Sequence, residues 1–320
     1  MSNKDKHEVQ VSAAFNVNAN KDLTVEAFKE PSPFTPAIDA NYQFRPELLR
    51  DLLAWWKLRE RTDDGLFLTG PTGSGKSSAI NQVAARLNWP VQQVNGHSRM
   101  EMSELIGHLI VLDGDMVWQD GPLTTAYRHG HLFILDELDL LDPGVTAGLN
   151  GIVEGRPLVL AGNGGEVVHP HPDFRFVCTG NTNGGGDSTG LHQGTMQQNV
   201  ALMDRMWVVY VDYPTKEQEL AILKAATPDL TTAIIETMID VANDVRNVYI
   251  GTRRDNGVEG DCEVTLSTRT LIRWANLSWF FQGTPNALSY ALDRALGNRA
   301  TPTTRSFLHE IVQRRFGKSE

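Results

Sequence analysis

The chain has 320 residues, 41% of them hydrophobic and 21% charged, and its net charge is −10, which describes an ordinary globular protein with room for one large domain or two smaller ones. The acidic balance disfavours nucleic acid as a partner, because phosphate binding needs a basic face. The two cysteines stand far apart in the sequence, so we expect no disulfide framework. The polar start lacks a secretory apolar region, and no apolar run reaches the ~18 residues of a membrane span. We therefore expect a cytoplasmic protein without a membrane partner.

The N-terminal part of the chain precedes the first strong motif. Apolar and polar residues alternate from residue 9 to residue 15, which predicts a short strand. A proline-rich linker follows at 31–36. Pro46 then opens a predicted helix, in which we interpret the paired Trp55 and Trp56 as packing residues.

A complete P-loop pattern, glycine separated by four residues from Gly-Lys-Ser, comes next. It is formed by Gly70-Pro71-Thr72-Gly73-Ser74-Gly75-Lys76-Ser77, with Ser78 following. An apolar strand is predicted just before it and an apolar helical pattern just after it, which is the context the motif needs. Glycines let backbone N–H groups and the helix N-terminus point at a phosphate. We therefore expect ATP binding, with Lys76 reaching the β- and γ-phosphates and Ser77 ligating Mg²⁺.

The remaining elements alternate strand and helix and then become helical. Short apolar runs predict buried parallel strands at 66–68, 91–94, 132–135, 174–179 and 207–211. Asp113-Gly114 between two apolar arms predicts a hairpin at 109–118. Beyond Pro214 the pattern is mostly helical, and the polar segment 251–260 is predicted to be a flexible loop. The predicted fold class is α/β, with a parallel sheet followed by a helical lid.

Two adjacent carboxylates end the predicted strand at 132–135. Asp136 is placed to hold the magnesium shell together with Ser77, and Glu137 to polarise the attacking water as a general base. The plain alternative is a strand end that carries acidic residues on a loop. The P-loop upstream favours the catalytic interpretation, because a two-part nucleotide site requires acidic residues at such a distance.

Three further residues are candidates, each with a structural alternative. Asn181 follows a strand and is placed to orient the water or touch the γ-phosphate, although asparagine there is ordinarily a turn residue. Arg205 precedes a strand and is the candidate arginine finger for a neighbouring subunit, or else makes a local ion pair with Asp204 or a capping contact. Arg269 follows an N-cap at Ser267 or Thr268 and either reaches the γ-phosphate from the lid or is simply solvated.

Together these motifs resemble an AAA+ ATPase. The hairpin at 109–118, with the segment 120–130 after it, resembles the MoxR branch, whose insert lies in helix 2. Further segments are similar to the CobS-type ATPase subunits of aerobic cobaltochelatase, and these are 36–44, 82–90, 169–175, 186–195, 198–205 and 313–317. The resemblance covers nearly the whole chain.

The resemblance implies a hexameric ring with ATP at the subunit interfaces, Asn181 as the sensor, Arg205 acting in trans and Arg269 linking hydrolysis to lid movement. It implies a partner with a von Willebrand A domain, similar to CobT, and a large chelatase subunit that inserts Co²⁺ into a corrin precursor in cobalamin biosynthesis. The expected domains are an N-terminal extension and linker at 1–40, an AAA+ nucleotide-binding domain at 41–214 and a helical lid at 215–320.

Two other hypotheses remain open. A chaperone or remodelling ATPase, for example of a phage or mobile element, shares every active-site residue and differs only in acting on a non-chelatase partner. A neighbouring gene for a chelatase large subunit distinguishes the two. A DNA translocase is disfavoured by the acidic charge and because the loops at 109–118 and 183–190 carry no lysine or arginine.

Overall fold

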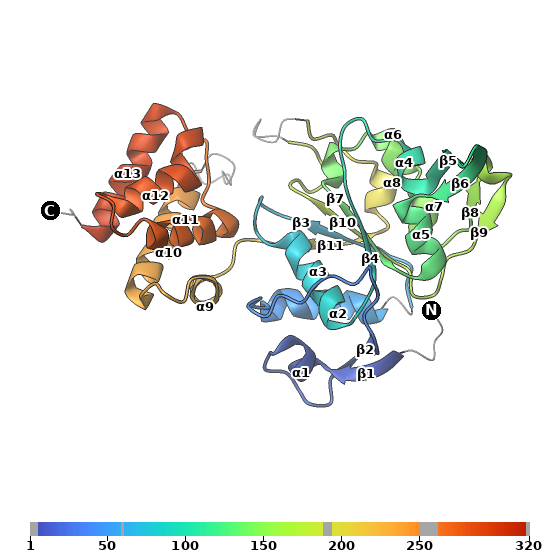
Figure 1. Ribbon diagram of the computed structural model, residues 1–320, viewed down its shortest axis with the longest axis horizontal. Helices are drawn as coiled ribbons and strands as arrows, with labels where there is room; N and C mark the ends of the chain where they lie inside the picture. The colour runs from blue at the N-terminus through green and yellow to red at the C-terminus, as the bar shows by residue number, and fades with distance from the viewer. Residues whose placement is uncertain (1–5, 59–60, 188–193, 250–261, 318–320) are drawn as a thin grey trace.

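The computed structural model describes residues 6–58, 61–187, 194–249 and 262–317, so the loop predicted at 251–260 lies outside the described residues. Figure 1 shows a sheet domain that continues through a single linker into a separate group of helices. The sheet domain carries the P-loop, and the group of helices forms the lid.

Five parallel strands form the central sheet, as the apolar runs predict. They are β3 (Gly65–Thr69), β4 (Val91–Asn95), β7 (Leu132–Asp136), β10 (Arg175–Gly180) and β11 (Met206–Tyr210). Their order is β11-β3-β10-β7-β4, and every neighbouring pair is parallel. Because β10 lies between β3 and β7, the segments that follow these three strands meet at one edge of the sheet. The α/β fold class is confirmed.

The three inner strands, β3, β7 and β10, are buried along their whole length, which explains why their sequences are largely apolar, whereas the edge strands β4 and β11 are partly exposed. Leu66 and Leu68 point into a core shared with α2 (Pro46–Leu58) and α3 (Lys76–Arg86). Phe67 points the other way, into a core shared with the segments between β4 and β10. Since successive side chains of a strand alternate between faces, each strand contributes to both cores.

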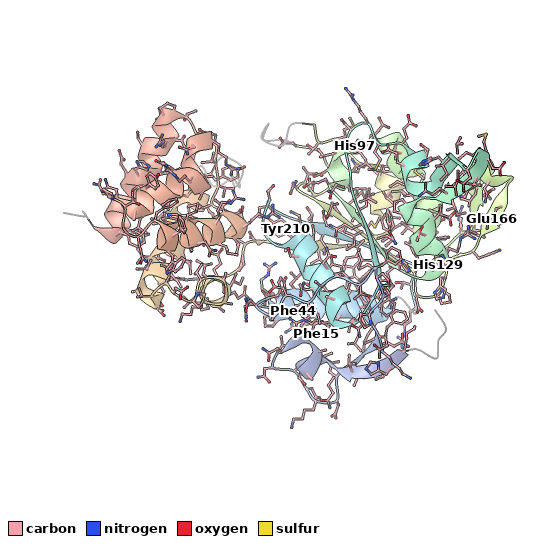
Figure 2. The ribbon with its side chains drawn as sticks, viewed as in Figure 1. Phe15, Phe44, His97, His129, Glu166 and Tyr210 are labelled. Atoms are coloured by element: carbon pink, nitrogen blue, oxygen red, sulfur yellow. The ribbon has the colours of Figure 1, made fainter. Side chains whose placement is uncertain are left out.

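The N-terminal segment packs on the first of these cores. It consists of β1 (Lys6–Gln10), α1 (Val11–Phe15) and β2 (Thr24–Phe28), with the two strands antiparallel. The strand expected at 9–15 is therefore wrong beyond residue 10. Val11 and Phe15 are one helical turn apart and both buried, so a helix buries them together. Phe15 meets Phe44 edge-on, with ring centroids 5.1 Å apart (Figure 2).

A hairpin interrupts the helical segment that follows β4, as expected for a helix-2 insert. Its strands are β5 (Gly107–Leu112) and β6 (Asp115–Asp120), between α4 (Met102–Ile106) and α5 (Pro122–His129). Asp113 and Gly114 both have positive φ at its turn, which suits an Asp-Gly hairpin. A second hairpin, β8 (Leu158–Leu160) and β9 (Glu166–Val168), lies beside it in Figure 1 and was not predicted.

The lid is helical, as predicted. Its helices are α9 (Lys216–Ala226), α10 (Thr232–Asn247), α11 (Thr268–Phe280), α12 (Ala287–Ala295) and α13 (Pro302–Phe316), and they enclose a core of their own around Trp274. The sheet domain contains three further short helices, α6 (Pro143–Ala147), α7 (Asn150–Val153) and α8 (Val200–Met203). Among the described helices, none combines the length and the apolar composition that a bilayer crossing requires.

Candidate active site

A cavity of about 590 Å³ lies between the P-loop and the lid. The P-loop contributes to its lining Gly73, Ser74, Gly75, Ser77 and Ser78. The lid contributes Thr268, Arg269 and Ile272, and the linker contributes Pro214. The motif and the lid thus share one space, which is large enough for a nucleotide.

The other end of this cavity is lined by the chain that precedes α2 and by apolar lid residues. The lining residues there include Asn41, Tyr42, Gln43, Ile222 and Ala226. Burial raises the pKa of the Tyr42 hydroxyl to about 12, which keeps it neutral at physiological pH. Asp39 and Arg45 also line the cavity, so this part combines apolar, neutral polar and charged side chains, a mixture that can pack against and hydrogen-bond a planar base.

The glycines of the P-loop are required by close approach and by backbone conformation. A Cβ atom on Gly70 would lie 2.2 Å from the carbonyl oxygen of Val211, and Gly70 also has a φ of +141°. Gly75, with a φ of 96°, is the N-cap of α3. The loop therefore brings backbone N–H groups and a helix N-terminus to the cavity, which is an arrangement that binds phosphate.

Lys76 is buried at the base of the loop. Its Nζ donates hydrogen bonds to the carbonyl oxygens of Gly70 at 2.7 Å and Pro71 at 3.0 Å, and to Oδ1 of Asn181 at 3.1 Å. Burial lowers the pKa of Lys76 to about 8, although the nearby Glu137 carboxylate acts in the opposite direction. Anionic phosphate oxygens would supply the charge that this buried ammonium group needs.

Asp136, at the end of β7, is surrounded by hydrogen-bond donors. Its Oδ1 accepts from Ser77 Oγ at 2.6 Å and from Thr179 Oγ1 at 2.8 Å. Its Oδ2 accepts from Nε2 of Gln93, on β4. The carboxylate is thus fixed in place and directed at the hydroxyl of the P-loop serine.

The pair Ser77 and Asp136 fits a magnesium site. Mg²⁺ is bound in nucleotide sites by one or two protein oxygens, together with phosphate oxygens and water. Within the described residues, no group of three or more His, Cys, Asp or Glu side chains forms a metal cluster. The hard oxygen donors at the end of β7 match the chemistry of Mg²⁺.

Glu137 and Asn181 lie next to each other beyond the ends of β7 and β10. Glu137 has left-handed backbone angles, φ 57° and ψ 45°, which are unusual for glutamate. Its Oε2 accepts a hydrogen bond from Asn181 Nδ2 at 2.7 Å. The buried carboxylate of Asp139 accepts from the backbone N–H groups of Asn181 at 2.7 Å and Thr182 at 2.9 Å, which fixes this turn. Asn181 therefore contacts both Lys76 and Glu137.

The structure does not bring Arg205 to the P-loop of its own chain. The carbonyl oxygen of Arg205 accepts from Gly65 N at 3.0 Å, at the start of β3, whereas the P-loop follows the end of that strand. A strand of this length spans about 16 Å. The side chain instead donates to Glu154 Oε1 at 2.6 Å and to the carbonyl oxygen of Ala201 at 2.5 Å. Within one chain the ion-pair partner of Arg205 is therefore Glu154, which is distant in the sequence, and not the neighbouring Asp204.

Arg269 does lie at the nucleotide cavity. The N-cap of α11 is Ser267, whose side chain accepts a hydrogen bond from Thr270 N. A Cβ atom on Gly73 would lie 2.6 Å from Ser267 Oγ and 3.7 Å from Arg269 Cβ. The first turn of α11 therefore rests on the P-loop, and the exposed Arg269 side chain borders the phosphate end of the cavity.

Three site residues escape sequence reasoning, namely Thr179, Gln93 and Asp139. Thr179 carried a usable signal, because it stands two positions before Asn181 and so shares its face at the strand end. Gln93 carried none, since its contact with Asp136 depends on the pairing of β4 with β7. Asp139 is a buried acid in a short 3₁₀ turn, and its role depends on the neighbouring strand.

The strand order, the P-loop and the acidic strand end define an AAA+ ATPase. Two family models agree with this, one described as "AAA domain (dynein-related subfamily)" over residues 65–206 and one as "CbbQ/NirQ/NorQ C-terminal" over residues 219–315. The chain belongs to the MoxR family of AAA+ ATPases.

Three characterised relatives show the range of this family. The aerobic cobaltochelatase subunit CobS of Sinorhizobium sp is 32% identical over 326 residues, which cover 99% of this chain and 93% of that protein. The denitrification regulatory protein NirQ of Pseudomonas aeruginosa is 32% identical over 77% of this chain and 88% of its own length. The gas vesicle ATPase GvpN of Haloferax mediterranei is 30% identical over 62% of each chain.

Proposed function

We propose that the chain is the magnesium-dependent ATP-hydrolysing subunit of a hexameric ring that performs conformational work on a partner with a von Willebrand A domain, as a cobaltochelatase component. The observation that carries this proposal is the similarity to CobS along nearly the whole chain, including the N-terminal segment before the P-loop. In this role the ring drives a separate chelatase subunit that inserts cobalt into a corrin precursor during cobalamin biosynthesis in the cytoplasm.

The proposed chemistry begins with ATP bound between the P-loop and the lid. The base occupies the end of the cavity beside Tyr42, and the phosphates lie against the N–H groups of the P-loop and Lys76. Ser77 and Asp136 would hold Mg²⁺, and the bound ion would neutralise phosphate charge. This assignment uses the cavity lining and the short contact between Ser77 and Asp136.

Hydrolysis then requires a base, an orienting group and a cation from outside the chain. Glu137 accepts a proton as the water oxygen bonds to the γ-phosphorus and the bond to the bridging oxygen breaks. Asn181 holds Glu137 and the phosphate end of Lys76 in one hydrogen-bonded group. Arg205 of a neighbouring copy stabilises the charge on the transferred group, and Arg269 couples its loss to the lid.

A second candidate is a remodelling ATPase that acts on a non-chelatase protein. The observation that favours it is the C-terminal match to the CbbQ/NirQ/NorQ model, together with the similarity to NirQ and GvpN. The catalytic residues are the same in both candidates. The partner alone separates them.

ATP turnover by the purified chain, measured against protein concentration with the mass followed by light scattering, tests the ATPase ring. We expect the rate per chain to rise cooperatively as a ring assembles, and to vanish in a Glu137→Gln variant of unchanged mass. A concentration-independent rate from a monomer would contradict the ring. Stimulation of that turnover by a CobT-like protein with its chelatase large subunit supports the first candidate, and indifference to both proteins supports the second.

A further inference from the structure

The linker between the sheet and the lid, residues 211–215, is attached to the P-loop. Val211 N donates to the carbonyl oxygen of Thr69 at 2.7 Å, immediately before the loop begins. Two residues later the hydroxyl of Tyr213 donates to the carbonyl oxygen of Thr72, within the loop, at 3.2 Å. A movement of the P-loop backbone therefore acts directly on the Tyr213 side chain.

Tyr213 also contacts the interior of the lid. The guanidinium carbon of Arg246, on α10, lies 4.2 Å from the centroid of the Tyr213 ring. Arg246 in turn donates two parallel hydrogen bonds to the carboxylate of Glu219, on α9, at 2.9 and 2.7 Å. Glu219 is fully buried and Arg246 is 7% exposed. A buried ion pair is weak evidence for stability, because desolvation offsets its attraction, so its placement here calls for another explanation.

The ion pair reaches the residues on both sides of the α11 N-cap. Nε of Arg246 donates to the carbonyl oxygen of Leu266 at 2.8 Å. The hydroxyl of Thr268 donates to Oε1 of Glu219 at 2.7 Å. Leu266 and Thr268 flank Ser267, which rests on the P-loop, and Thr268 directly precedes Arg269. The two charged side chains thus fix the first turn of α11 with directional bonds.

We propose that Tyr213, Arg246 and Glu219 form a positioning relay, which sets the place of Arg269 over the P-loop and passes P-loop movement to the lid. The relay is continuous from the Thr72 carbonyl through the tyrosine and the ion pair to Thr268. None of the three residues is expected to touch the reacting atoms, so they act through Arg269, an assignment that rests on the role proposed for Arg269 above.

Tyr213→Phe tests the relay with the least disturbance, since it keeps the ring beneath Arg246 and removes only the hydroxyl. We expect kcat/KM for ATP to fall about fivefold, the effect of one lost hydrogen bond. In an Arg269→Ala background the same change is expected to cause no further fall, because the relay then has nothing to position. Tyr290→Phe, on a lid tyrosine that packs against Phe281, is the matched control and keeps the wild-type rate.

Glu219→Gln provides a second variant, with Asp293→Asn, which breaks an ion pair elsewhere in the lid, as its control. Circular dichroism shows whether the Glu219→Gln variant folds. If it does not fold, the result for Tyr213→Phe alone decides whether the relay stands. Wild-type turnover in Tyr213→Phe overturns the relay. The relay is also overturned if the double variant with Arg269→Ala loses kcat/KM by the product of the two single losses, because the two residues then act independently. Wild-type turnover in Arg269→Ala alone also overturns the relay. The proposed function fails separately, if the wild-type chain does not hydrolyse ATP or if Glu137→Gln hydrolyses it at the wild-type rate.

Discussion

Asn181 donates a hydrogen bond from Nδ2 to Oε2 of Glu137 at 2.7 Å. Through its Oδ1 the same side chain accepts from Lys76 Nζ at 3.1 Å. The proposed base and the proposed phosphate-binding cation are therefore held by one amide group. A group that draws Lys76 away from Asn181 leaves the Thr72 hydroxyl, at 3.2 Å, as a donor to the same Oδ1, so the hold on the Glu137 carboxylate depends in part on what Lys76 binds.

Asn181→Ala is expected to lower kcat for ATP hydrolysis about tenfold or more, because the Glu137 carboxylate loses the hydrogen bond that Asn181 donates to it, and a bond to a charged group is stronger than one between neutral groups. ATP affinity is expected to change little, since the P-loop contacts remain. Single-turnover hydrolysis and equilibrium titration separate the two effects. Asn183→Ala is the control, because the Asn183 side chain accepts a hydrogen bond from Gly185 N within its own turn. Unchanged kcat in Asn181→Ala would show that the contact is a turn contact alone.

The lowered pKa of Lys76 predicts a pH dependence of ATP binding. The pKa of about 8 means that the free protein loses this charge above pH 8, whereas bound phosphates would raise the pKa and restore the charge. Binding above pH 8 therefore takes up a proton, and affinity is expected to fall about tenfold per pH unit there and to level off below it. Calorimetry at pH 9 in two buffers of different ionisation enthalpy measures the number of protons taken up per ATP bound.

Lys76→Met is the control for that titration. This variant is expected to bind ATP more weakly, and it has no ammonium group at position 76 that could take up a proton on binding. Proton uptake that persists unchanged in Lys76→Met assigns the effect to another group. Affinity that stays level from pH 8 to pH 10 in the wild-type protein would mean that Lys76 remains charged in the free site.

The sequence predicted those parts of the molecule that local pattern determines. The P-loop is contiguous, so its residues fix its conformation, and strands such as β7 are recognisable because both faces are buried. The helix from Val11 to Phe15 was missed, because a five-residue segment fits alternation and helical spacing equally well until its packing partners are known.

The parts that were missed in the site depend on pairing between distant segments. Gln93 reaches Asp136 because β4 pairs with β7 in a register that places Asn95 opposite Asp136. Glu154 meets Arg205 because α7 ends beside the start of β11. No pattern within either segment carries that information, so the contacts of Asp136 with Gln93 and of Arg205 with Glu154 were not predicted.

Thr179→Val is expected to lower kcat by about tenfold, although threonine and valine have nearly the same shape. The hydroxyl of Thr179 donates to Asp136 at 2.8 Å and accepts from Glu137 N at 3.3 Å, so it sets the relative position of the two carboxylates. Its loss leaves a buried carboxylate oxygen with one donor fewer. Steady-state turnover at several Mg²⁺ concentrations makes the measurement.

Thr179→Ser is the conservative partner of that variant, because it restores the hydroxyl without the methyl group. Recovery of turnover in the serine variant supports hydrogen bonding as the cause. Equal defects in both variants would assign the effect to packing of the methyl group against the sheet.

Arg205 is expected to act on the site of a neighbouring copy, because it lies at the opposite end of β3 from its own P-loop. Arg205→Ala should therefore abolish turnover without weakening ATP binding. Mixed with Glu137→Gln, which is inactive for a different reason, it should regain activity, since a site with intact Glu137 then meets a neighbour with intact Arg205. Random mixing of equal amounts restores about a quarter of the wild-type sites in a closed ring.

Arg156→Ala, which removes the other arginine paired with Glu154, is the control and should stay active. A mixture as inactive as its components would place the function of Arg205 within its own chain, in the ion pair with Glu154.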